Sequence, residues 1–134
     1  MSATLNLTAQ DQATIRSAAY GAVSLLAAAS AKPSKAATVG SLALLSATGP
    51  IGHLLNAKSK DIHLPGKTVA QLADQVLPAL TTATTLLTHQ DPAEADNFRT
   101  TVLTALEAAA ATTPAPQPAV TEMTRKITEA LHTA

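Results

Sequence analysis

The feature that most constrains the fold is a long apolar stretch from Ile15 to Leu55, interrupted by the polar turn Lys32-Pro33-Ser34-Lys35. No other part of the chain has as much apolar surface to bury. In its first segment, small or apolar residues recur at spacings of three and four on two opposite faces, so neighbours are needed on more than one side. The stretch therefore predicts a helical hairpin at the centre of an all-α domain, enclosed by the other helices.

Length and composition limit the architecture further. A chain of 134 residues predicts a single domain over residues 1–134. It contains 30 Ala and 18 Leu but one Tyr, one Phe, no Trp and no Cys. Small side chains bury little area each, so we expect long helices in extensive contact, or a partner chain that adds contact. The absence of cysteine excludes disulfides, thiolate metal ligands and a cysteine nucleophile.

Prolines and caps divide the chain into helices. Pro33 ends the first helix, because the residue before a proline is pushed out of the helical region. Gly49-Pro50 interrupts the second apolar segment, and Pro78 lies inside a third helix predicted from Thr68 to about His89. We therefore expect proline breaks near Pro50 and Pro78.

Two further helices complete the prediction. Asp91-Pro92-Ala93-Glu94 combines a capping Asp, a Pro at the first helical position and a Glu at the third, which marks a helix start. An amphipathic helix is expected from about Pro118 to His132. Because the connections are short, the fold class is an antiparallel helical bundle of four to five helices.

The second apolar segment raises a membrane alternative. From Ala36 to Ala57 there is no Lys, Arg, Asp or Glu, and that length approaches a membrane span. Polar Thr, Ser and His residues and the Gly-Pro break dilute the segment, so we expect a buried hairpin. A membrane-associated helical hairpin remains the alternative. The N-terminus lacks the cationic start and apolar core of a secretory signal, which predicts a cytoplasmic protein.

One stretch resembles a phosphate-binding loop. Residues 61–68 end in Gly66-Lys67-Thr68, but Asp61 occupies the place of the first glycine of that pattern and no strand precedes it. The simplest interpretation is a Pro-Gly turn that leads into a helix. The alternative is a small-ligand or anion-binding site at Gly66, Lys67 and Thr68, where backbone N–H groups begin a helix.

Other chemistries find little support in the sequence. The four histidines, His53, His63, His89 and His132, lie in separate contexts, so we predict no metal and no cofactor. No nucleophile elbow is present, and we expect no enzyme activity. The net charge is +0, and the loop lysines form no recognition stripe, which argues against nucleic acid as a partner.

The remaining hypothesis is a non-enzymatic interaction or assembly module. Its apolar helices offer more small-residue faces than one chain needs to cover, so we expect a homo-oligomer, with a protein partner as a further possibility. Charge is also uneven: residues 12–60 carry five bases and no acid, whereas residues 61–124 carry seven acids and two bases. These two portions either compensate each other within one chain or meet head to tail between copies.

Overall fold

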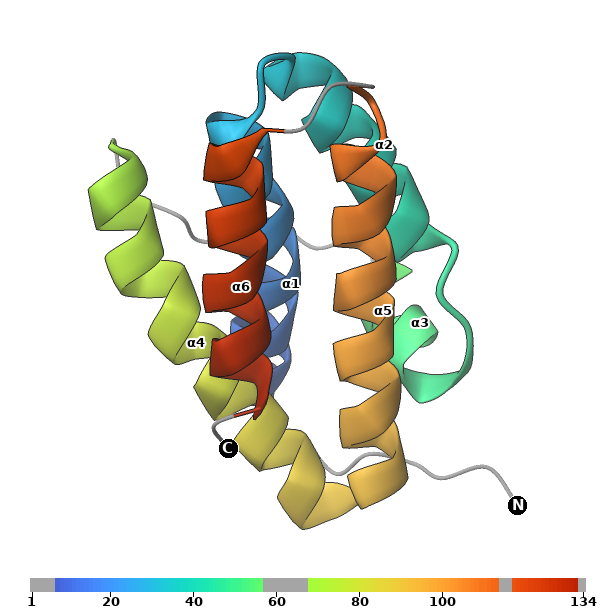
Figure 1. The fold of residues 1–134 in the computed structure, drawn as a ribbon. Coiled ribbons are helices and arrows are strands. Elements are labelled where there is room, and N and C mark those ends of the chain that lie inside the picture. The colour runs from blue at the N-terminus through green and yellow to red at the C-terminus, as the bar shows by residue number, and fades with distance from the viewer. Residues whose placement is uncertain (1–6, 57–67, 114–116, 133–134) are drawn as a thin grey trace.

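The computed structural model describes residues 7–56, 68–113 and 117–132, and these residues form a bundle of six α-helices (Figure 1). The helices are α1 (Ala9–Ala29), α2 (Pro33–Leu45), α3 (Gly49–Asn56), α4 (Val69–Gln90), α5 (Pro92–Ala110) and α6 (Pro118–His132). In Figure 1, α1 and α5 run upward while α2, α4 and α6 run downward. The closest helix pairs, α1 with α4 and α2 with α5, are antiparallel. The predicted all-α antiparallel bundle is confirmed.

Helix α1 is the centre of this bundle. It contacts each of the other five helices, and roughly half of its residues are buried. Half of these buried positions are alanine or glycine, which let neighbouring backbones come close on several sides. The buried residues are Ile15, Arg16, Ala18, Ala19, Gly21, Ala22, Val23, Leu25, Leu26 and Ala27.

Helix α2 lies at the edge of the bundle, against α1 and α5. Only Ala36, Gly40 and Leu44 are buried, at a spacing of four that gives one narrow stripe. Leu42 and Leu45 face outward, with 58% and 45% of their surface exposed. The prediction that the whole hairpin is enclosed is therefore correct for α1 and wrong for the outer face of α2. One covered stripe suffices to hold α2, because each small residue on it permits close contact.

The two proline positions behave differently. Near Pro50, the chain leaves α2 at Leu45 and starts α3 at Gly49, whose φ of 74° favours glycine. The predicted break is present there, immediately before the proline. At Pro78, α4 continues as one helix from Val69 to Gln90. Pro78 is exposed, so the Asp74 carbonyl that loses its backbone partner can be hydrated instead.

Local caps fix the helix ends, and the predicted cap at Asp91 is among them. The Thr8 hydroxyl accepts from the Asp11 N–H at 3.0 Å, and the Asp11 carboxylate accepts from the Thr8 N–H. Asp91 ends α4 by donating its N–H to Leu87 O at 2.7 Å, and its carboxylate accepts from the Ala93 N–H at the start of α5. A single residue, Asp91, therefore caps both helices and is the whole connection between α4 and α5.

Candidate interaction surface

The candidate surface is the outer face of α2, which consists of Lys35, Thr38, Leu42 and Leu45. All four are exposed, and their spacing of three, four and three residues places them on one side of the helix. This side is opposite the buried stripe through Gly40. Between Ala36 and Leu45 the helix contains no charged residue, so the two leucines have no ionic neighbour on their own helix.

Gly40 determines how α2 sits on the bundle. A Cβ at this position would lie 2.7 Å from Val23 Cγ1 of α1 and 3.4 Å from Ala109 Cβ of α5. The absence of a side chain therefore lets α2 approach both helices at one point. Because that inner contact orients the helix, the opposite face with Leu42 and Leu45 necessarily points away from the core.

The C-terminal end of α2 is closed by its own chain. The Ser46 N–H donates to Leu42 O and Ala43 O at 3.1 and 3.2 Å, the Ser46 hydroxyl donates to Leu42 O at 3.0 Å, and the Ala47 N–H donates to Leu44 O at 3.2 Å. No basic residue lies in the last turn of α2, and no acid lies in its first turn. The helix dipole of α2 is thus uncompensated by side chains of the helix at either end.

The ends of α3 and α6 differ from the end of α2, because other helices hold them. Arg16 Nη1 and the Tyr20 hydroxyl, both on α1, donate to Leu54 O and Leu55 O of α3 at 3.2 and 2.9 Å. Arg16 is buried, and partial burial raises the pKa of the Tyr20 phenol. A guanidinium suits the negative end of the short helix α3.

Helix α6 is fixed in the same way. The Thr81 hydroxyl of α4 donates to Ala130 O at 2.8 Å, and Arg99 Nε of α5 donates to Leu131 O at 3.0 Å. Arg99 also pairs with Asp96 at 2.6 Å. The ends of α3 and α6 therefore serve the packing of the bundle, while the end of α2 remains at its edge.

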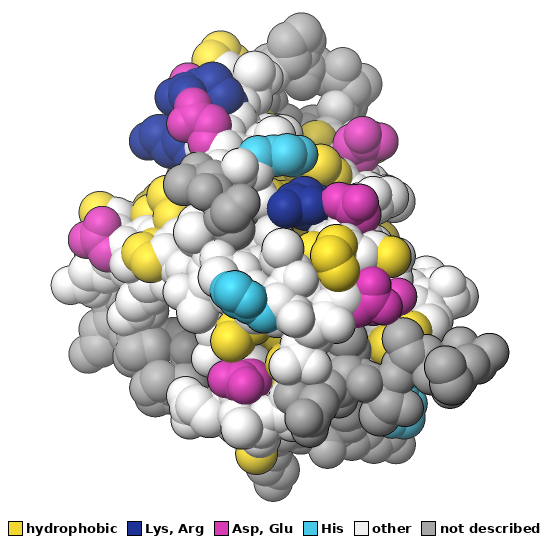
Figure 2. All heavy atoms as spheres, turned by 90° about the horizontal axis from the view of Figure 1, so that it is seen from below, with side chains coloured by type: hydrophobic (Ala, Val, Ile, Leu, Met, Phe, Trp, Pro, Cys, Tyr) yellow, Lys and Arg dark blue, Asp and Glu magenta, His cyan; other side chains and the backbone are white. Residues whose placement is uncertain are grey.

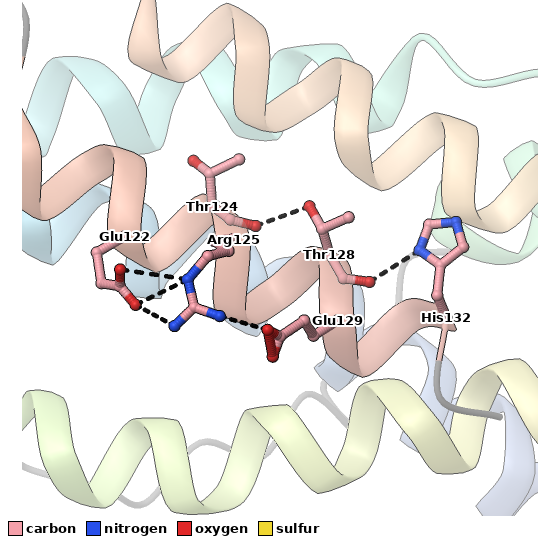
Figure 3. A network of polar contacts seen from close by, with 6 residues as sticks. All are labelled: Glu122, Thr124, Arg125, Thr128, Glu129 and His132. Carbon is pink, nitrogen blue, oxygen red and sulfur yellow. Dashed lines mark hydrogen bonds and ion pairs between the residues drawn. The ribbon is translucent and has the colours of Figure 1, made fainter.

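The outward side of α6 is an exposed face of charged side chains. Arg125 pairs with Glu122 and Glu129 within the helix (Figure 3). The hydrogen bond from Arg125, with its positive charge, lowers the pKa of the Glu122 carboxyl. The Thr124 and Thr128 hydroxyls donate to carbonyls one turn earlier. Such pairs and back-bonds are satisfied within α6 and make it a solvated face.

The end of the molecule seen in Figure 2 is also mixed in character. Acidic and basic side chains lie close together there, and the hydrophobic side chains that are coloured form small separate areas. This end contrasts with the outer face of α2, where Leu42 and Leu45 are neighbours one turn apart. The surface of α2 is the more plausible place for an apolar contact.

The predicted anion site can be placed only in part. Gly66 and Lys67 lie outside the described residues, whereas Thr68 is the N-cap of α4 and its hydroxyl accepts from the Gln71 N–H at 3.1 Å. That hydroxyl performs the capping role of the simpler interpretation. The sequence pattern found this helix start correctly, and the ligand remains a prediction.

The described part of the chain offers neither a metal site nor a membrane span. In residues 7–56, 68–113 and 117–132, no three His, Asp or Glu side chains are grouped so as to hold a metal ion. Over the same ranges, no helix is long and apolar enough to span a bilayer. Comparison with known protein families, with curated proteins and with solved structures found no match to this chain.

The sequence missed the outer face of α2 as a surface. The sequence predicts that the whole apolar stretch from Ile15 to Leu55 is enclosed, and Leu42 and Leu45 lie within that stretch. One signal pointed outward: Lys35 and Thr38 lie on the same side of the helix as the two leucines, at spacings of seven and four from Leu42. A seam that begins with lysine and threonine is more typical of a surface than of a core.

Proposed function

We propose that this protein is a non-enzymatic interaction or assembly module whose copies associate through the outer face of α2. The observation that carries the proposal is the exposure of Leu42 and Leu45, side by side on the outer face of a helix whose opposite stripe is buried. Single exposed leucines are ordinary on protein surfaces. Two on one helix face, with no charge among them, have the character of a helix that docks against another helix.

The energetics favour a modest, reversible association. Complete burial of a leucine side chain contributes about 1.5–3 kcal/mol, and Leu42 and Leu45 are each about half exposed. Two copies would bury four such half-exposed side chains, for about 3–6 kcal/mol before the costs of association. Neighbouring threonine and serine residues on α2 add contact area at little cost in side-chain entropy. This gain is no larger than the cost of association, so we expect at most a weak dimer, which forms at hundreds of micromolar protein.

Sedimentation velocity over a concentration series tests the proposal. The wild-type chain is expected to shift from monomer to dimer as its concentration rises, and Leu42→Lys and Leu45→Lys are expected to remain monomeric. Thr82→Lys is the matched control, because Thr82 is exposed on α4, which does not contact α2. It adds the same charge elsewhere and should dimerise like the wild type.

Two results would contradict the proposal. A wild-type chain that stays monomeric at several hundred micromolar would rule out self-association. If Leu42→Lys still dimerises but Thr82→Lys does not, the contact between copies lies on α4. Circular dichroism of each variant shows whether the monomer itself remains folded.

A further inference from the structure

The outer face of α2 is self-complementary when it is reversed. Lys35, Thr38, Leu42 and Leu45 follow one another at spacings of three, four and three residues, and this pattern reads the same in both directions. All four side chains are exposed. In an antiparallel pair of α2 helices, Lys35 lies opposite Leu45 of the second copy and Thr38 lies opposite Leu42 of the second copy. Each leucine then meets a threonine or the aliphatic stem of a lysine.

Charge favours the same orientation. Lys35 is the third residue of α2, so its positive charge lies near the positive end of the helix dipole, where it is unfavourable. At the other end, the last turn contains no base, and its hydrogen bonds come from Ser46 and Ala47 of the same chain. An antiparallel partner corrects both ends at once, because each Lys35 reaches the negative end of the other α2.

A parallel pair would do the opposite. It would bring the two Lys35 side chains together at two positive helix ends, and like charges in that position repel. Either orientation can have two-fold symmetry, which closes the assembly at two copies. Charge is therefore the property that favours the antiparallel pair.

We propose that two copies of this chain pair in antiparallel orientation through α2, with Lys35 of each copy against the C-terminal end of the other α2. This inference rests on the proposed function and specifies its partner, orientation and register. It requires no rearrangement of the bundle, because the four side chains already point away from the core.

Disulfide trapping tests the register, since the chain contains no native cysteine. A mixture of Thr38→Cys and Leu42→Cys, one of them carrying a mass tag, is expected to form the mixed disulfide faster than either variant forms its own. Leu45→Cys alone should cross-link poorly, because the two Leu45 positions would be about 15 Å apart along the helix axes. That separation is far beyond the Cβ–Cβ distance of about 4 Å that a disulfide requires.

A charge variant tests the role of Lys35. Lys35→Glu places an acid in the first turn of α2, which favours that helix in the monomer, but it also places an acid beside the C-terminal end of the second copy. We expect the thermal midpoint of the dilute monomer to stay the same or rise, while the dimer dissociation constant increases several-fold. A merely structural role for Lys35 would not weaken the dimer while leaving the monomer equally stable or more stable.

The outcomes separate the two proposals. If the wild type dimerises and Leu45→Cys cross-links rapidly with itself, the pair is parallel and this inference is wrong while the proposed function stands. If Lys35→Glu leaves the dissociation constant unchanged, the register is also wrong. A chain that remains monomeric at all concentrations overturns both.

Discussion

Helices α1 and α2 are neighbours in sequence and similar in composition, yet the bundle uses them differently. Both are rich in alanine and leucine. Helix α1 contacts all of the other helices, whereas α2 contacts α1, α3 and α5 and turns its outer leucines to solvent. The amount of apolar surface in a helix thus does not determine its depth in this fold.

The distribution of small residues explains the difference. Helix α1 has alanine or glycine at positions 18, 19, 21 and 22, so close neighbours fit on more than one side. Helix α2 presents small residues inward at Ala36 and Gly40, and that single stripe is filled by α1 and α5. A helix with one close-packing stripe belongs at the edge, and its remaining apolar residues are available for contacts outside the chain.

The strongest test of this contrast is the same substitution in both helices. Leu26→Ala removes a fully buried side chain from α1 and is expected to lower the free energy of unfolding by about 2–5 kcal/mol. Leu42→Ala removes an exposed side chain and should change it by less than about 0.5 kcal/mol in dilute solution. Chemical denaturation followed by circular dichroism measures both. Equal losses would show that α2 is as enclosed as α1.

The close approach at Gly40 gives the next largest effect. Gly40→Ala places a methyl group 2.7 Å from Val23 Cγ1, so either the Val23 side chain or α2 must shift, and we expect a loss of about 1–3 kcal/mol. Ser41→Ala at the adjacent position is the control and should be nearly neutral. In a double-mutant cycle, Val23→Ala should recover part of the loss by making room. If Gly40→Ala stabilises the protein, the space between Gly40 and Val23 is larger than these distances indicate.

Polar anchoring is a second difference between the two helices, and it gives a smaller effect. Tyr20→Phe removes the hydroxyl that donates to Leu55 O at 2.9 Å, with an expected loss of about 0.5–1.5 kcal/mol. Tyr20 is the only tyrosine in a chain without tryptophan, so its ultraviolet absorbance in the wild type reports the same contact directly. The pKa of Tyr20 is raised by burial. An alkaline titration in which Tyr20 ionises at the same pH as free tyrosine would contradict the contact.

Sequence patterns predicted the features that depend on a few adjacent residues. The cap at Asp91 and the helix Pro118–His132 were both predicted, because each depends on hydrogen bonds or periodicity within a turn or two. Threonines of α4 also form bonds within one turn, with the Thr84 hydroxyl donating to Leu80 O at 2.8 Å. Local chemistry determines these elements, so a local pattern suffices to find them.

Contacts between distant residues could not be predicted in this way. Arg16 appears in the sequence as an ordinary charged residue of a helix, but it is buried because the end of α3 meets it, 38 residues further along the chain. Leu42 and Leu45 have the spacing of core residues, and only the choice of α1 as the centre leaves them outside. For the candidate surface, the residue pattern is therefore visible in the sequence, but only the packing of the helices shows that this face points to solvent.

The smallest expected effect concerns the outer face of α6, which is the charged counterpart of the outer face of α2. Arg125 lowers the pKa of Glu122, so the ionised pair stabilises the fold at pH values above the ordinary glutamate pKa of about 4.3. That contribution is lost as the pH falls through the lowered pKa, because the carboxylate must then be protonated. Glu122→Gln should therefore slightly lower the thermal midpoint at neutral pH and flatten its decline in acid.

Both side chains are exposed to solvent, so added salt should shrink the difference between wild type and Glu122→Gln. The charge of Lys126 on the same helix also lowers the pKa of Glu122, by less than Arg125 does, so the same substitution in an Arg125→Gln background should keep only a small pH-dependent effect. If the acid dependence persists in full without Arg125, the pair with Arg125 does not lower the pKa of Glu122. The outer face of α6 would then lack the internal pairing that distinguishes it from the leucine face of α2.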